Sequence, residues 1–350
     1  MTNPLAHDLD HVLAHTAGGW DELRGQRLFI TGGTGFFGGW LLETLAWANR
    51  QLNLGAEALV LSRNPAAFAR HAPHLAEDRA IRFLTGDVRT FEFPRGPFSH
   101  VIHAATQASA TLNADNPQLM FDTIVEGTRR TLSFAAACGA QKFLLISSGA
   151  VYGKQPPELA YLPEDHPGAP DPLDPAAAYG EGKRAAELLG ALYSRQPGLE
   201  TKIARGFAFV GPRLPLDAHF AIGNFIRDAL RGGPIRVQGD GTPIRSYLYA
   251  ADLAVWLWQI LWRGQSGRAY NVGSESAISI GELARVVADT LGGGEVLIAR
   301  APVPGQPAAR YVPSTRRAAT ELGLEPRVDL TEGIRRTAAW AARQPLPATS

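Results

Sequence analysis

Short apolar runs alternate along the chain with longer stretches whose apolar residues recur at helical spacing. The short runs have the length of β-strands and lie at 27–31, 57–61, 80–84, 99–103 and 142–146. Helical spacing is found at 36–47, 117–138, 174–191, 250–262 and 279–291. Strands that alternate with helices are typical of a parallel sheet covered by helices on both faces.

This pattern predicts an α/β fold, a Rossmann-type doubly wound parallel sheet with a smaller C-terminal α/β lobe. A chain of 350 residues is too long for one small core and fits such a pair of units. We expect residues 1–26 to be an N-terminal helical extension, packed on the outside and without a chemical role. Residues 27–200 then carry most of the sheet, and residues 201–350 form mainly the smaller lobe.

Composition narrows the class of protein. The net charge of +1 gives no bulk attraction to nucleic acid or to an anionic membrane. The single cysteine, Cys138, excludes an internal disulfide and a cysteine-rich metal site, and we expect no metal. The N-terminal region carries acidic residues and lacks the apolar core of a signal peptide, and no run reaches the roughly 18 apolar residues of a membrane span. We therefore expect a cytoplasmic protein.

A glycine-rich turn joins the first strand to the first long helix. It holds Gly33-x-Gly35-x-x-Gly38, the spacing of a dinucleotide-binding turn. One glycine makes the turn, one lets backbone N–H groups approach a pyrophosphate, and one lets helix and strand pack closely. The helix N-terminus, near Phe36, then presents its partial positive charge to the phosphates. A strand before the turn and a helix after it favour a cofactor site over an empty loop.

The end of the second strand bears on which dinucleotide is bound. About 20 residues past such glycines, an acidic residue normally holds the ribose 2′-hydroxyl of NAD. Here Ser62 takes that place and Arg63 follows. A hydroxyl and a guanidinium suit the 2′-phosphate of NADP better, so the pair favours NADP, with NAD as the alternative. Arg63 as a solvated loop charge, or stacked on adenine, is the competing interpretation.

A tyrosine and a lysine share one face of the helix at 174–191. Tyr179 and Lys183 are four residues apart, which places an ammonium beside a phenol. A nearby cation favours the phenolate and lowers the pKa of the tyrosine below its ordinary value of about 10. Such a tyrosine can exchange a proton with a hydroxyl or carbonyl group. His103, at the end of the fourth strand, is interpreted as a structural residue and not as the base.

Together these motifs resemble the extended short-chain dehydrogenases, the NAD(P)-dependent nucleotide-sugar epimerases, dehydratases, decarboxylases and reductases. The resemblance covers nearly the whole chain after residue 26. Its motifs are the glycine turn at 31–38, Gly86-Asp87-Val88, the strand end at 147–153, Tyr179-x-x-x-Lys183, and family-like segments at 204–213, 239–247, 251–253 and 270–273.

The resemblance implies a set of site residues and a nucleotide-diphosphate sugar as substrate. The implied catalytic residues are Ser148, Tyr179 and Lys183. The implied cofactor residues, besides Tyr179 and Lys183, are Gly32, Gly33, Thr34, Gly35, Phe36, Phe37, Gly38, Ser62, Arg63, Asn64, Asp87, Val88, Ala104, Ala105 and Thr106. The implied substrate residues are Ser148, Gly149, Ala150, His219, Phe220, Asn224 and Arg245, with Arg245 on the substrate pyrophosphate. The family also implies that the chain returns to the sheet after residue 200, and that two copies pair through the helices near 117–138 and 177–195.

The reaction depends on the two residues after Ser148. By the same resemblance, the dehydratases carry an Asp-Glu pair directly after the active-site residue, and the decarboxylases carry a Glu two residues after it. This chain has Gly149 and Ala150, and neither can move a proton. The departure argues against a 4,6-dehydratase and weakens a decarboxylase, although the C-terminal half is most similar to those enzymes.

The candidate functions are ranked, with a nucleotide-sugar decarboxylase or dehydratase placed after the first two below and before the last. A C4-epimerase needs only Ser148, Tyr179 and Lys183, and we favour it. An NADPH-dependent 4-keto-sugar reductase is the alternative, which Ser62 and Arg63 support. A non-catalytic NAD(P) sensor on the same fold comes last, because a sensor has no need of the three catalytic residues.

Overall fold

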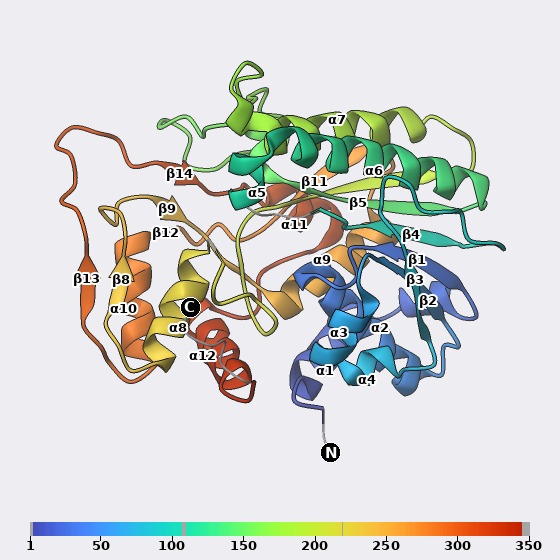
Figure 1. Cartoon of the computed structure of the whole chain (residues 1–350), viewed down its shortest axis with the longest axis horizontal. Helices are drawn as coiled ribbons and strands as arrows, with labels where there is room; N and C mark the ends of the chain where they lie inside the picture. Colours follow the sequence, from blue (N-terminus) through green and yellow to red (C-terminus); the bar gives the residue numbers. More distant parts are fainter. Residues whose placement is uncertain (1–2, 107–109, 219, 345–350) are drawn as a thin grey trace.

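A parallel sheet of seven strands forms the centre of the described chain. The computed structural model describes residues 3–106, 110–218 and 220–344 (Figure 1). In those residues the strand order is β11-β6-β5-β4-β1-β2-β3, and every neighbouring pair is parallel. The strands are β1 (Arg27–Thr31), β2 (Glu57–Ser62), β3 (Ile81–Thr85), β4 (His100–His103), β5 (Lys142–Ser148), β6 (Glu200–Gly206) and β11 (Arg268–Val272). The predicted doubly wound α/β fold is confirmed.

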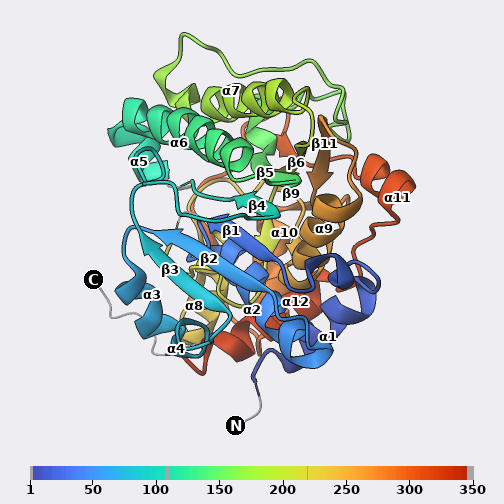
Figure 2. The ribbon, with the colours of Figure 1, turned by 90° about the vertical axis from the view of Figure 1, so that its right-hand side faces the viewer.

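Both faces of the sheet are buried, as the continuous apolar runs require. Along β1, Leu28 and Ile30 belong to one core and Phe29 to the other. The Phe29 side is covered by α6 (Pro117–Ala137) and α7 (Ala178–Tyr193), which lie side by side in Figures 1 and 2. The opposite side is covered mainly by α2 (Phe36–Leu52), α9 (Ala250–Arg263) and α1 (Ala6–His15), with α3 (Pro65–His71), α4 (Pro73–Ala76) and α11 (Arg316–Leu322) at its margins.

The predicted elements differ from the observed ones mainly at their ends. β5 continues to Ser148, two residues past the apolar run. The helix expected from residue 174 begins as a 3-10 turn, η3 (Pro175–Ala177), and α7 follows it. β6 and β11 both lie after residue 199 and join the main sheet, so the second half of the chain contributes two of its strands. The domain boundaries at 26 and 200 stay predictions.

The N-terminal helix α1 buries one face against the core and leaves the other face exposed, and its expected lack of a chemical role stays a prediction. Leu9 and Val12 of α1 are fully buried, and α1 packs against α9 and α2. The buried Asp8 accepts a hydrogen bond from Tyr249 at 2.7 Å and pairs with Arg336 at 2.6 Å. An ion pair therefore links a helix near the N-terminus to a helix near the C-terminus. The segment also contains the 3-10 turn η1 (Trp20–Leu23).

The C-terminal lobe is built from short strands and three helices, and Figure 1 shows it beside the carboxyl ends of the sheet strands. β8 (Ile235–Val237) pairs with β13 (Val296–Ile298), and β9 (Ile244–Arg245) lies between β12 (Ile278–Ser279) and β14 (Arg310–Tyr311). β7 (Phe209–Val210) pairs with β10 (Leu248–Tyr249) at the junction with the sheet. The helices are α8 (Ala221–Leu230), α10 (Ile280–Thr290) and α12 (Leu330–Ala341), and α5 (Ala110–Asp115) and η2 (Gly149–Tyr152) complete the described elements.

Candidate active site

A cavity of about 1320 Å³ lies between the carboxyl ends of the sheet strands and the C-terminal lobe. This is the edge where ligands bind in open α/β sheets. Its walls come from both units of the chain. The sheet side supplies Gly32, Gly35, Phe36, Phe37, Ala104, Thr106, Ser148, Tyr179 and Lys183, and the lobe supplies Phe220, Arg245, Tyr247 and Tyr311, among others.

The glycines of the first turn are required by close backbone packing. Gly32 has a positive φ of 71°, and a Cβ there would lie 2.4 Å from the carbonyl of Ala104. A Cβ on Gly38 would lie 2.3 Å from the carbonyl oxygen of Gly32. At Gly35, the N-cap of α2, the nearest atom to such a Cβ is 3.5 Å away, so the backbone there is open to the cavity. A bare helix N-terminus facing a cavity fits the pyrophosphate of a dinucleotide.

The residues expected at the adenosine end follow β2 and β3. Ser62 is buried, and its hydroxyl accepts a hydrogen bond from the backbone N–H of Asn64 at 3.3 Å. The Asn64 side chain caps α3 by accepting from the N–H of Ala67, which is a structural use of that residue. Asp87 lies near Arg63, whose charge contributes to lowering the pKa of the Asp87 carboxyl.

The Asp87 carboxylate already has a partner. Arg89 binds it through two nitrogen atoms at 2.9 and 3.1 Å, and this hydrogen bonding is the largest cause of the lowered pKa of Asp87. Val88 is buried, and a Cβ on Gly127 of α6 would lie 2.8 Å from its side chain. The Asp87 carboxylate is therefore engaged by Arg89 and Val88 acts in packing, and neither residue is among the described residues that line the cavity.

Ser148, Tyr179 and Lys183 meet at the floor of the cavity. Ser148 ends β5, while Tyr179 and Lys183 lie in the first two turns of α7. The Lys183 ammonium donates to the hydroxyl of Thr106 and to the carbonyl of Ile146, both at 2.8 Å. It lies 5.9 Å from the centre of the Tyr179 ring. The spacing of four residues therefore brings the predicted pair together at one place.

The protonation of this pair differs from the sequence expectation. Burial raises the pKa of the Tyr179 phenol, and its interaction with Ser148 acts in the opposite direction. Burial also lowers the pKa of Lys183 to about 8, which the charge of Glu187 opposes. The expected lowering of the Tyr179 pKa by Lys183 is wrong in net direction, because exclusion of water disfavours the phenolate more than the neighbours stabilise it.

Small residues after β4 shape one wall of the cavity. Ala104 and Thr106 line the cavity, and the backbone N–H of Ala105 donates to the hydroxyl of Thr31 at 3.2 Å. His103, directly before them, is buried between Thr31 and Thr128. Its ring does not line the cavity, so the structural interpretation of His103 is supported.

The predicted substrate residues are only partly assembled. Arg245 lines the cavity and donates to the carbonyl of Ile244 at 2.8 Å, which leaves other guanidinium N–H groups for a ligand. Phe220 and Ala150 also line it. Gly149 and Asn224 are absent from the described lining, and the Asn224 side chain accepts instead from Arg227 at 3.2 Å. His219 lies outside the described residues.

A charged network that the sequence did not predict lies directly behind the end of β5. Glu187 accepts from the hydroxyl of Ser147 at 2.5 Å and pairs with Arg205 at 2.6 Å. Arg205 also donates to the hydroxyl of Tyr152 at 2.8 Å. Glu187 lies one turn after Lys183 on α7, and that spacing was the available signal.

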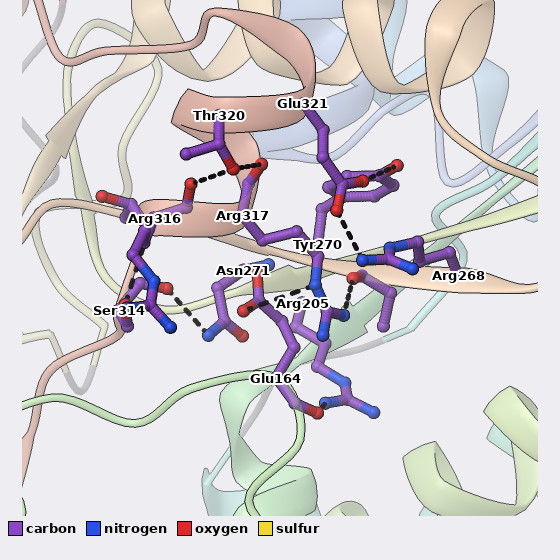
Figure 3. Close-up of polar contacts among 12 residues, drawn as sticks. Glu164, Arg205, Arg268, Tyr270, Asn271, Ser314, Arg316, Arg317, Thr320 and Glu321 are labelled. Atoms are coloured by element: carbon purple, nitrogen blue, oxygen red, sulfur yellow. Dashed lines mark hydrogen bonds and ion pairs between the residues drawn. The ribbon is translucent and has the colours of Figure 1, made fainter.

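The same network continues to the C-terminal segment. Asn271 of β11 accepts from Tyr152, and its amide donates to the carbonyls of Leu162 and Ser314 at 2.8 and 3.0 Å. Its backbone N–H donates to Glu164 at 3.0 Å, and Figure 3 shows Asn271 between Glu164 and Ser314. One buried residue therefore ties the loop after β5 and the chain after β14 to the sheet edge.

The described residues contain no cluster of three or more His, Cys, Asp or Glu side chains that could hold a metal ion. No helix among them is both long and apolar enough to cross a membrane.

The fold and the site define the class: a Rossmann-type enzyme whose cavity combines a dinucleotide turn with a Ser-Tyr-Lys centre. Comparison with known proteins agrees. A family model, the NAD dependent epimerase/dehydratase family, matches residues 28–273. UDP-glucuronic acid decarboxylase 1 of Xenopus tropicalis is 31% identical over 312 residues, which cover 89% of this chain and 71% of that protein. The chain belongs to the NAD dependent epimerase/dehydratase family, and the predicted resemblance is confirmed.

Solved structures support the same fold. A UDP-glucose 4-epimerase of Thermotoga maritima, solved with UDP-glucose, has a TM-score of 0.76 at 23% identity and covers 91% of this chain and 99% of its own. DesIV, a dTDP-glucose 4,6-dehydratase of Streptomyces venezuelae solved with NAD, has a TM-score of 0.75 at 26% identity and covers 90% and 97%. Proteins of this architecture therefore include epimerases, dehydratases and decarboxylases, and the reaction of this chain must be argued from its own residues.

Proposed function

We propose that the protein is an NAD-dependent C4-epimerase of a nucleotide sugar. The observation that carries this proposal is the pairing of an assembled Ser148-Tyr179-Lys183 centre with two residues, Gly149 and Ala150, that have no carboxylate. Such a centre can move one proton at one oxygen. The relatives named above act on nucleotide sugars, which supports that substrate class.

The chain's own groups divide the work at the sugar. Tyr179 exchanges a proton with the 4-hydroxyl, and Ser148 hydrogen-bonds the same oxygen. Lys183 holds a positive charge close to the phenol, and Arg245 binds the substrate pyrophosphate through its guanidinium fork. When bound, an oxidised nicotinamide supplies a hydride acceptor and a positive charge that favours the Tyr179 phenolate. An epimerase returns the hydride to the opposite face of the same carbon.

The decarboxylase interpretation draws on the 31% identity to UDP-glucuronic acid decarboxylase. The carboxylate side chains that line the cavity argue against a decarboxylase. Among the described lining residues the carboxylates are Asp171 and Asp174, and each accepts a backbone N–H in its own loop, from Leu173 and Ala176. Neither takes the place two residues after Ser148, here Ala150, where the decarboxylases of the family are expected to carry a glutamate. The site therefore favours chemistry without carbon–carbon bond cleavage.

A second candidate is an NADPH-dependent 4-keto-sugar reductase. Ser62 and Arg63 at the end of β2 favour a 2′-phosphate, and the raised pKa of Tyr179 suits a phenol that donates a proton. The two candidates differ in cofactor use, because a reductase consumes one NADPH in each turnover and an epimerase consumes none.

One experiment separates these functions. The dinucleotide released by denaturing the purified protein is identified, and the protein is incubated with UDP-glucose and with UDP-glucuronate while absorbance at 340 nm and the products are followed. We expect NAD, formation of the C4 epimer and no net change in absorbance. A pentose product would establish the decarboxylase instead, and released NADPH with activity only on 4-keto sugars would establish the reductase.

Tyr179→Phe tests the mechanism in the same assay. The variant keeps the ring and loses the hydroxyl, so turnover should fall by about 10²-fold or more while cofactor binding is unchanged. Full activity in this variant would show that another group moves the proton.

We also propose that two copies pair through α6 and α7. Leu188 and Leu192 on the outer face of α7 are 62% and 53% exposed, and Phe121 of α6 is 37% exposed. Apolar side chains gathered on two adjacent helices favour burial against a second copy.

A further inference from the structure

The space above Gly149 is filled by the side chain of a distant residue. A Cβ built on Gly149 would lie 2.6 Å from the hydroxyl oxygen of Tyr311 and 2.7 Å from the ring of Phe207. A Cβ atom does not lie closer than 3.0 Å to a non-bonded atom unless that atom moves, so position 149 has no room for a side chain while Tyr311 and Phe207 stay in place.

Tyr311 is held in that position from several sides. It belongs to β14, where it pairs with Arg245 of β9, and its ring lies 4.6 Å from that of Phe207. The next residue, Val312, donates its N–H to Gln155 at 2.9 Å and accepts from the N–H of Leu162 at 2.9 Å. The hydrogen bond from Asn271 to Ser314, drawn in Figure 3, fixes the chain just beyond.

The hydroxyl of Tyr311 lies over Gly149, the residue directly after Ser148. Ser148, Tyr179 and Tyr311 all line the cavity, and the nearby Ser148 hydroxyl acts to lower the pKa of each phenol against the larger effect of burial. Burial raises the pKa of Tyr311, so at neutral pH it is a neutral phenol with a proton to donate. Arg245 lies 5.8 Å from the centre of its ring.

The hydrogen-bonding capacity of the Ser148 hydroxyl limits where its proton can point. A serine hydroxyl has one proton to donate and two acceptor positions. One acceptor position of Ser148 takes the backbone N–H of Ala150 at 3.2 Å. If Tyr311 donates to the other, both are used, and the serine proton can only point toward Tyr179 or toward a substrate oxygen beside it.

We propose that Tyr311 is a positioning residue, which orients the Ser148 hydroxyl toward the reacting oxygen, and that Gly149 is glycine to make room for it. The inference rests on the proposed function, since Ser148 and Tyr179 act there at the sugar oxygen. The proposal gives Tyr311, which belongs to the C-terminal segment, a role in the proton transfer at Ser148 and Tyr179.

The test compares Tyr311→Phe with a matched control, Tyr193→Phe. Both substitutions remove a phenol hydroxyl that interacts with a serine. Tyr193 lies 3.0 Å from Ser133 at the far end of α7, and it does not line the cavity. For each protein, kcat and KM are measured with UDP-glucose from pH 6 to 10, and the thermal unfolding midpoint shows that it is folded.

We expect Tyr311→Phe to lower kcat about tenfold, the equivalent of about 1.4 kcal/mol, with little change in KM. Ser148 would also stabilise the Tyr179 phenolate less well, so the limb of the kcat profile that reports phenolate formation should move to higher pH. Tyr193→Phe should match the unchanged protein in both respects. Gly149→Ala, which displaces the same hydroxyl from the other side, should move the limb in the same direction.

The outcomes separate the two proposals. If the unchanged protein converts the sugar and Tyr311→Phe has the same kcat and pH profile, the positioning role is overturned and the proposed function stands. A fall in kcat without any movement of the pH limb overturns it as well, because loss of packing alone gives that result. If the unchanged protein converts no nucleotide sugar, the proposed function fails and the role of Tyr311 fails with it.

Discussion

His103 lends itself to a quantitative prediction, because every proton around its ring is accounted for. Thr128 donates its hydroxyl proton to the carbonyl of Ile124 at 2.7 Å, so at 3.1 Å from His103 Nε2 it can only accept. Thr31 accepts the N–H of Ala105, which leaves its proton for His103 Nδ1 at 2.7 Å. The ring is therefore neutral, with its proton on Nε2. A second proton on Nδ1 would face a hydroxyl that already points its own proton there.

Burial and the charge of Lys183 lower the pKa of His103 to about 3. An unfolded histidine has a pKa near 6.5. Between these two values the unfolded chain binds a proton that the folded chain does not, so the free energy of unfolding decreases as the pH falls. At pH 5, about 1.5 pH units below the unfolded value, the loss from this residue is about 2 kcal/mol relative to pH 7.

The assay is urea unfolding of the unchanged protein and of His103→Gln at pH 7 and at pH 5. The variant is less stable at pH 7, but its loss between the two pH values should be smaller by about 2 kcal/mol. His71→Gln, which removes an exposed histidine on α3, is the control and should keep the loss of the unchanged protein. Equal losses in the unchanged protein and in His103→Gln would refute the reasoning, since His103 would then titrate alike in the folded and unfolded chains.

Two further predictions concern the cofactor and the oligomer. Gly38→Ala, whose methyl group would meet the backbone of the turn at 2.3 Å, should abolish NAD binding in calorimetry and lower stability by about 1–3 kcal/mol, whereas Gly39→Ala meets only the Arg213 side chain at 3.3 Å and should keep binding. Unaltered binding by Gly38→Ala would contradict the packing argument. Leu188→Glu combined with Leu192→Glu should convert a dimer to a monomer in light scattering. Burial of each leucine side chain in the interface would contribute about 2 kcal/mol to the free energy of dimer formation. A dimer that survives both changes would place the interface elsewhere.

The sheet and its glycine turn were predictable because their causes are local. A buried parallel strand shows as a continuous apolar run, and the close approach of Gly38 to Gly32 requires glycine whatever the rest of the chain does. The Tyr179 and Lys183 pair was predictable for the same reason, since helical spacing alone puts both on one face. In each case the interacting residues lie within one strand, turn or helix.

The residues that were missed interact across long stretches of sequence. Tyr311 reaches Gly149 only because β14 pairs with β9 and because Asn271 holds the chain beyond it. No spacing in the sequence encodes that meeting. The burial of α1 follows from partners equally distant, Tyr249 and Arg336, which bind Asp8. A position for the N-terminal segment could not be read from its own apolar residues.

The pKa of Tyr179 shows why a correct motif can still lead to a wrong chemical expectation. The pKa of a phenol depends on nearby charges, which a motif reveals, and on desolvation, which only the packed structure reveals. Here burial raises the pKa of Tyr179 and lowers that of Lys183 to about 8, so the two neighbours change in opposite directions from one cause. In the proposed epimerase, the positive charge of a bound oxidised nicotinamide would favour the Tyr179 phenolate that burial disfavours, so Tyr179 would act as a base only while the acceptor of the hydride is present.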